Sequence, residues 1–98
     1  MGKKNLTWKE FRKQLNITPE EEAQIKLEKD IIEATINARK ESKLTQRELS
    51  QKSGVKQPAI ARIEKYVNSP QTNTLIKLLY PMGYTIKVVP INKNIKKI

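Results

Sequence analysis

Residues 56–62 bring together side chains that can hydrogen-bond to the edges of DNA bases. The amide of Gln57 can form a bidentate pair with adenine, and Lys56 or Arg62 can pair with guanine. Each good pair discriminates against the wrong base by about 1–3 kcal/mol. Pro58 offers only apolar contact, such as contact with a thymine methyl group. This segment therefore suits recognition of a base sequence by contact.

The chain offers little for catalysis. It contains no cysteine and no histidine, which excludes a thiol nucleophile, a disulfide framework, a thiolate metal site and imidazole acid–base chemistry. The carboxylates of Glu20, Glu21, Glu22 and Glu48 lie at expected helix starts, where capping and the helix dipole explain them. We therefore expect no enzymatic activity, no cofactor and no metal site; an enzyme is the alternative from another functional class.

The charge of the chain favours a polyanionic partner. Twenty Lys and Arg against ten Asp and Glu give a net charge of +10 on 98 residues. The excess is uneven, because residues 1–30 carry seven basic and six acidic side chains and residues 31–98 carry thirteen basic and four acidic ones. The content of hydrophobic residues, 37%, is ordinary for a globular domain. The last two-thirds of the chain is therefore the expected partner-binding part.

Nothing in the chain suits membrane insertion or secretion. The first residues, MGKKNLTWKE, lack an apolar signal segment, and no apolar run approaches the ~20 residues that span a bilayer. No expected helix pairs a large apolar face with a lysine-rich one, which argues against a membrane-surface protein. We therefore expect a cytoplasmic protein.

Residues 1–30 are expected to form a helical arm and the start of a long helix. An apolar stripe at positions i, i+3 and i+7 predicts a helix over residues 7–15. This stripe either packs onto the protein's own core or forms an exposed docking site. Thr18, Pro19 and Glu21 form the start signal of a second helix, which meets no breaker before the Ser42 region. The residues of the stripe are Trp8, Phe11 and Leu15.

Two short helices follow in quick succession. Thr45 is an expected N-cap with Glu48 completing a capping box, and Gly54 ends the helix that they start. Only two residues later, a helix is expected from Gln57 to about Lys65, and the two helices must cross sharply. One core can be built from seven apolar residues of this region, namely Leu44, Leu49, Val55, Ile60, Ile63, Leu75 and Leu78.

The end of the chain is expected to change from helix to strand. Ser69 and Pro70 mark the start of a last helix, which Pro81 should end or kink near Tyr80. The β-branched segment 84–90 predicts one strand, followed by a basic tail to residue 98. A lone strand needs a partner, which is its twin in a dimer, the edge of another protein's sheet or the chain's own helices. We prefer the dimer, with pairing carried by Tyr84, Ile86 and Val88.

The segment Thr45 to Pro70 resembles the helix-turn-helix of the lambda-repressor-like, or XRE, family. The resemblance covers about Ile32 to Tyr84. It rests on Thr45-Gln46, Glu48-Leu49, Gly54-Val55, Gln57, Ile60, Ile63-Glu64 and Ser69-Pro70. With the arm and strand, the expected fold is all-α: a lambda-repressor-like helix-turn-helix bundle of about five helices, with an N-terminal helical arm and one short C-terminal β-strand. Residues 31–83 are its DNA-binding domain and residues 84–98 its strand and tail.

This resemblance implies roles for individual residues. The second helix of such a motif enters the major groove with its N-terminal end, so base contacts are expected from Lys56, Gln57, Pro58 and Arg62. The family pattern assigns Gln46 to a phosphate, and Arg47, Lys65 and Asn68 are further phosphate candidates. It also pairs Arg39 with Glu64 as a partly buried, structural ion pair. Tyr66 is a departure, because it stands where the family usually has glycine; either it is strained in the left-handed conformation or the helix continues.

The whole architecture looks like that of a HigA-type antitoxin. The resemblance combines the arm WKEFRKQLNITPEEE, the long helix, the helix-turn-helix and the ending GYTIKVVPI. It implies a homodimer that binds double-stranded operator DNA, represses its own operon and neutralises a HigB-type toxin, an mRNA-cleaving enzyme of the RelE-like class. Trp8, Phe11 and Leu15 are then the toxin-contact candidates. The alternative is a stand-alone phage-type or mobile-element repressor, in which the arm is only structural.

Overall fold

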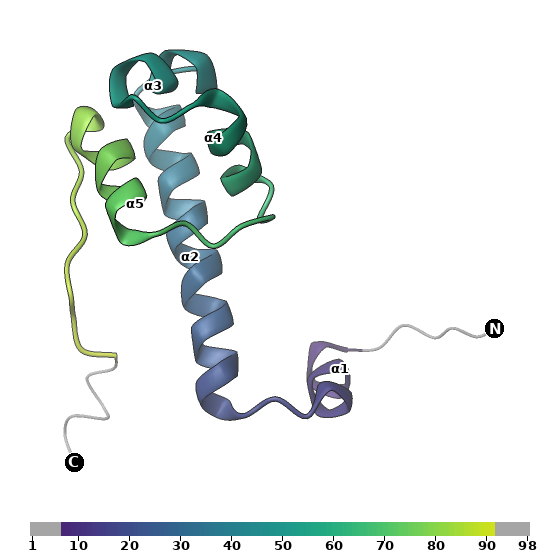
Figure 1. Cartoon of the computed structure of the whole chain (residues 1–98). Coiled ribbons are helices and arrows are strands. Elements are labelled where there is room, and N and C mark those ends of the chain that lie inside the picture. The colour runs from purple at the N-terminus through teal and green to yellow at the C-terminus, as the bar shows by residue number, and fades with distance from the viewer. Residues whose placement is uncertain (1–6, 92–98) are drawn as a thin grey trace. The chain divides into compact units, whose positions relative to one another are not determined.

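The computed structural model describes residues 7–91, without the side chains of Trp8, Lys9 and Arg12, as five α-helices and one short 3-10 helix (Figure 1). The all-α prediction is confirmed for this part of the chain. The chain divides into two compact units, which we call the arm unit (residues 1–31) and the core unit (residues 32–98). The helices are α1 (Trp8–Leu15), α2 (Pro19–Glu41), α3 (Gln46–Ser53), α4 (Gln57–Glu64), α5 (Thr72–Leu79) and the 3-10 helix η1 (Tyr80–Met82).

Local capping fixes where the two helices of the arm unit begin. At the start of α1, Glu10 N–H donates to Thr7 Oγ1 at 3.1 Å and Thr7 N–H donates to Glu10 Oε1 at 3.2 Å. The same reciprocal box starts α2, with Thr18 N–H donating to Glu21 Oε1 at 2.9 Å and Glu21 N–H to Thr18 Oγ1 at 3.1 Å. None of the described side chains in residues 7–31 is buried. This unit therefore has helix starts fixed by sequence but no core among its described residues.

The core unit is held together by one apolar cluster. Leu49 from α3, Ile60 from α4 and Leu78 from α5 are the largest fully buried side chains. They pack with Ile32 of α2 and Ile63 of α4. Because Ile60 and Ile63 face this cluster, the opposite side of α4 is turned to solvent. The seven core residues predicted from the sequence are all buried or half-buried.

The C-terminal segment is not the predicted strand. Tyr84 N–H donates to the Leu79 carbonyl at 3.0 Å, and residues 85–91 then run on as extended chain with no hydrogen bond to any described residue. The prediction of a strand over Tyr84–Pro90 is wrong for the described chain, because a β-ladder needs a second strand and residues 7–91 provide none. The tail from residue 92 lies outside the described residues.

Two helix ends resolve the departures noted in the sequence. α4 stops at Glu64, and Tyr66 takes the left-handed conformation with φ 62° instead of continuing the helix. α5 ends at Leu79, and Pro81 lies within η1, so the last helix does end near Tyr80 as predicted. Its start is two residues later than expected, at Thr72 with Gln71 as N-cap, instead of at Ser69 and Pro70.

Candidate nucleic-acid interface

A tight turn between α3 and α4 sets the geometry of the candidate interface. Thr45 caps α3 by accepting from Glu48 N–H at 3.0 Å, while the Glu48 carboxylate accepts from Thr45 N–H at 2.9 Å. Gly54 closes the other end with φ 80°, a value that glycine adopts without strain, and donates its N–H to Ser50 O at 2.9 Å. Only Val55 and Lys56 remain before α4 begins, so α4 must cross α3 sharply.

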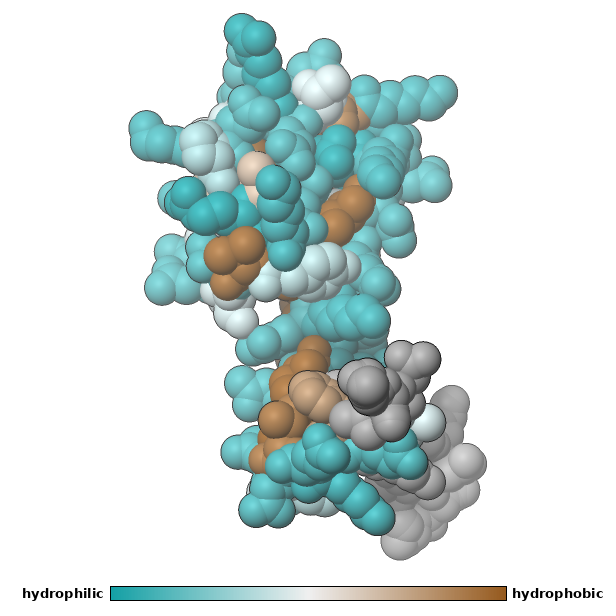
Figure 2. All heavy atoms as spheres, turned by 90° about the vertical axis from the view of Figure 1, so that its right-hand side faces the viewer, coloured by the Kyte–Doolittle hydropathy of each residue, from teal (hydrophilic) through white to brown (hydrophobic). Residues whose placement is uncertain are grey.

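The four predicted base-contacting residues are all exposed. Lys56, Gln57 and Pro58 lie next to one another at the start of α4, and proline is tolerated there because the first turn needs no amide donor. Arg62 follows Pro58 at i+4 and Lys65 at i+7, which places these three on one side of the helix. α4 lies at the right of the core unit in Figure 1, and that side of the unit is mostly hydrophilic in Figure 2. The start of α4 is therefore presented to solvent.

The predicted ion pair between Arg39 and Glu64 is present and joins α2 to α4. Arg39 Nε donates to Glu64 Oε2 at 2.7 Å and Arg39 Nη2 donates to Glu64 Oε1 at 2.9 Å. Arg39 Nη1 also donates to the Leu44 carbonyl at 2.8 Å. The two side chains are only 14% and 10% exposed. This network fixes α4 against α2 and the loop before α3.

The pKa values of both groups show that the pair is ionised. Burial alone would raise the pKa of Glu64, but hydrogen bonds from Arg39 and Gln46, together with the positive charges of Arg39 and Lys40, leave the pKa below its ordinary value. The hydrogen bond to Glu64 raises the pKa of Arg39. Both charges are therefore maintained at neutral pH.

Gln46 belongs to this network, which the sequence did not reveal. Its Nε2 donates to Glu64 Oε1 at 2.9 Å, and its side chain is half-buried. An amide NH2 group has two donors, so one N–H remains available for a phosphate. The other phosphate candidates, Arg47, Lys65 and Asn68, are exposed. Gln46 is thus oriented by Glu64 of α4.

Tyr66 closes α4 in a strained conformation. Its N–H donates to the Ile63 carbonyl at 2.9 Å, and Val67 N–H donates to the Arg62 carbonyl at 3.0 Å. These two hydrogen bonds form the Schellman pattern that normally uses glycine. A non-glycine residue in this conformation costs about 1–2 kcal/mol.

The arm unit carries exposed apolar side chains. Phe11 and Leu15, two of the predicted toxin-contact residues, are 42% and 49% exposed, and the side chain of Trp8 lies outside the described residues. Sequence reasoning missed Ile25 and Leu27, which are 47% and 59% exposed on α2. The signal that could have found them is an apolar residue among the charged residues of a helix. Figure 2 shows the resulting apolar surface on this unit.

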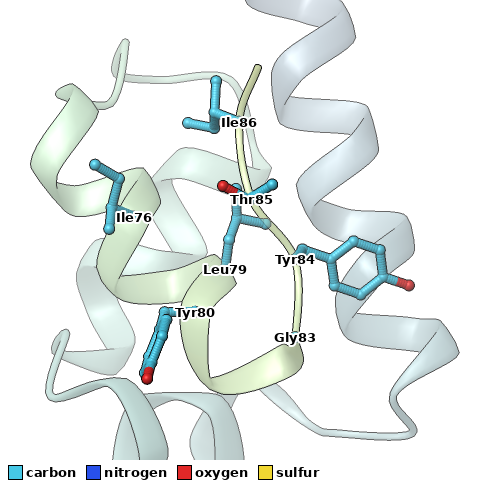
Figure 3. A pocket seen from close by; sticks show the side chains of 7 residues that line it. All are labelled: Ile76, Leu79, Tyr80, Gly83, Tyr84, Thr85 and Ile86. Atoms are coloured by element: carbon cyan, nitrogen blue, oxygen red, sulfur yellow. The ribbon is translucent and has the colours of Figure 1, made fainter.

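A shallow cavity lies beside the C-terminal segment. It has a volume of about 370 Å³, and Figure 3 shows its lining side chains. Tyr84 and Ile86, two of the predicted pairing residues, are among them, and the third, Val88, is fully exposed. The remaining lining residues are Ile76, Leu79, Tyr80, Gly83 and Thr85.

A capped helix, a glycine turn and a second helix with an exposed polar start define a helix-turn-helix DNA-binding domain. The chain belongs to the XRE-type helix-turn-helix family, whose pattern matches residues 36–87. It is a DNA-binding transcriptional regulator, of a family that is not typically enzymatic. Within residues 7–91, no helix is long and apolar enough to cross a membrane.

Two known proteins are similar over most of the chain. An uncharacterized HTH-type transcriptional regulator of Haemophilus influenzae is 43% identical over 84 residues, which are 86% of this chain and 85% of that protein. A solved chain of a toxin-antitoxin module from Streptococcus pneumoniae is 38% identical, with a TM-score of 0.66 over 89% of this chain and 96% of that chain. Both similarities extend beyond the helix-turn-helix.

Proposed function

We propose that this protein is the antitoxin of a type II toxin-antitoxin pair, which represses its own operon and neutralises a RelE/HigB-like mRNA-cleaving toxin. The observation that carries the DNA half is the exposure of Lys56, Gln57, Pro58 and Arg62 on a helix held by a partly buried ion pair. The similarity to a chain of a Streptococcus pneumoniae toxin-antitoxin module supports the other half. Access to operator DNA and to mRNA places this function in the cytoplasm.

In this proposal, α4 enters the major groove and α3 lies over the DNA backbone. Gln57 pairs with adenine, Lys56 or Arg62 pairs with guanine, and Pro58 makes an apolar contact. Gln46 donates its remaining N–H to a phosphate together with the start of α3. Arg47, Lys65 and Asn68 add further phosphate contacts.

A dimer would present two copies of α4 to the DNA. The backbone groups of segment 85–91 make no hydrogen bonds to described residues, and two of its side chains, Ile86 and Val88, are exposed. Pairing with its twin through Tyr84, Ile86 and Val88 would satisfy these groups and cover the apolar side chains. Two recognition helices about 34 Å apart then match one turn of a pseudo-palindromic operator.

The arm unit is the proposed toxin contact. Leu15, Ile25 and Leu27 are exposed on it, and none of its described side chains is buried. A protein partner that covers Leu15, Ile25 and Leu27 would remove this surface from water. Phe11 and Trp8 remain proposed toxin contacts from the sequence. The stand-alone repressor remains the second candidate, favoured by the Haemophilus influenzae relative, which is named only as a transcriptional regulator.

Binding to duplex DNA tests the first half of the proposal. The probe is the duplex from upstream of the protein's own coding sequence, with an unrelated duplex of equal length as the reference. Gln57→Ala should relax preference at one or two base positions, whereas Gln46→Ala should weaken binding to both duplexes similarly. Lys77→Ala, an exposed change on α5, is the control. Equal effects from Gln57→Ala and Gln46→Ala would contradict the assigned roles.

Co-expression with the product of the neighbouring gene tests the second half. A toxic neighbour should be neutralised by the wild type and co-purify with it, and Phe11→Asp with Leu15→Asp should abolish both while DNA binding persists. A neighbour that is neither toxic nor bound would leave the stand-alone repressor as the function.

A further inference from the structure

Tyr66 is held in a conformation that glycine would adopt without strain. Its φ is 62°, and two hydrogen bonds, from Tyr66 N–H to Ile63 O and from Val67 N–H to Arg62 O, fix it there. The ends of α3 and η1 use Gly54 and Gly83 in this region, with φ values of 80° and 84°, whereas the ends of α1 and α2 use Asn16 and Lys43, with φ values of 60° and 58°. Tyr66 is the aromatic residue among them. A bulky side chain is uncommon in this conformation, and strained residues cluster at functional sites, so the side chain of Tyr66 is a candidate for a function.

The side chain of Tyr66 has no evident structural role. It is 46% exposed, it is not part of the apolar cluster, and its hydroxyl makes no hydrogen bond to any described residue. Partial desolvation and the nearby carboxylate of Glu33 both raise the pKa of Tyr66. The hydroxyl therefore stays protonated at neutral pH and can donate a hydrogen bond.

The position of Tyr66 ties it to the recognition helix. The hydrogen bond between Val67 and Arg62 anchors this turn to the last turn of α4. Lys65 and Asn68, two phosphate candidates, stand on either side of it along the chain and are exposed. When α4 lies in a major groove, the residues just past its end are close to the flanking sugar-phosphate backbone, and tyrosine hydroxyls are among the groups that bind phosphates.

We propose that the hydroxyl of Tyr66 donates a hydrogen bond to a DNA backbone phosphate beside the groove that α4 enters, and so helps to set the register of α4. This inference rests on the proposed DNA-binding function. The donor is neutral, so the contact releases no counterions. It should therefore strengthen binding to every duplex without changing the salt dependence of binding.

Three substitutions separate strain, ring and hydroxyl. Tyr66→Gly removes the strain and the side chain, Tyr66→Ala removes the ring but keeps the strain, and Tyr66→Phe removes only the hydroxyl. All three should lower affinity on the order of 3- to 10-fold for both the upstream duplex and the unrelated one. Tyr66→Gly alone should raise the thermal midpoint of unfolding, by about 2–8 °C. Gain of stability with loss of binding is the signature of a strained functional residue.

Salt dependence supplies the matched control. In a plot of log affinity against log salt concentration, the slope should be unchanged by Tyr66→Phe and reduced by about 0.9 by Lys65→Ala. Wild-type affinity in Tyr66→Phe, or a lower thermal midpoint in Tyr66→Gly, would overturn this inference alone. A wild-type protein that binds neither duplex would overturn the DNA-binding function and this inference together.

Discussion

Removing one partner of the Arg39–Glu64 pair should destabilise the core unit strongly. The carboxylate of Glu64 is 10% exposed and accepts two hydrogen bonds from Arg39 and one from Gln46. Arg39→Met leaves that charge buried with Gln46 as its remaining donor, and also leaves the Leu44 carbonyl without its partner. A buried charge stripped of its counter-charge costs about 3–5 kcal/mol. Because small domains are stable by about 5–15 kcal/mol, this loss is a large fraction of the total.

Urea denaturation followed by far-UV circular dichroism at neutral pH measures this loss. The double variant Arg39→Met with Glu64→Leu removes both charges and should be more stable than Arg39→Met alone, because an apolar pair of similar volume needs no counter-charge. Lys77→Met, an exposed change on α5, is the control and should change stability little. A loss of unfolding free energy below about 1 kcal/mol in Arg39→Met would refute the reasoning. So would a double variant whose loss equals the summed losses of Arg39→Met and Glu64→Leu.

Three further predictions follow from other features. The pKa of Glu64 is lowered in the folded state, so the ionised carboxylate stabilises the fold fully above its unfolded pKa of about 4.3. This stabilisation is lost as the pH falls through the lower folded pKa. In acid titration, the difference in unfolding free energy between wild type and Glu64→Gln should therefore shrink over this pH range. Gly54→Ala should cost about 1 kcal/mol in urea denaturation because φ is 80° there, whereas Lys52→Ala should cost little. Val88→Asp should convert the proposed dimer to a monomer in light-scattering measurements, whereas a wild-type dimer whose mass this change leaves the same would remove segment 85–91 from the interface.

Local signals were sufficient to predict the helix-turn-helix. The capping boxes at Thr45 and Thr18 form between residues three apart. The turn predicted at Gly54 is present, with the left-handed φ that glycine adopts most easily. The same holds for the core, since the apolar residues of α3, α4 and α5 lie at helical spacing. These features depend on neighbours along the chain, which a sequence displays directly.

Features that depend on distant residues were harder to predict. The hydrogen bond of Gln46 to Glu64 spans 18 residues, and nothing near Gln46 indicates it. The pair of Arg39 with Glu64 spans 25 residues and was expected only from the family resemblance. The start predicted for α5 at Ser69 and Pro70 is two residues too early, because the helix begins at Thr72 with Gln71 as its N-cap.

The predicted strand failed for a different physical reason. Its β-branched residues do favour extended chain, and residues 84–86 lie beside α5 (Figure 3). A β-strand, however, forms only when two segments pair, and the composition of one segment does not identify the other. The same limit applies to the arm unit, where the apolar stripe is visible in the sequence but the surface that covers it is not.

The central claim is that α4, with Gln57 at its start, is the element that enters the DNA. Amide chemical shifts of the isotope-labelled protein, followed by NMR while the upstream duplex is added, test this most directly on a chain of 11.4 kDa. The account predicts the largest shifts at Gln46 and over residues 56–62 except Pro58, which has no amide proton, with small shifts in residues 7–31. Largest shifts in residues 7–31 or in α5, with those of residues 56–62 unchanged, would contradict it.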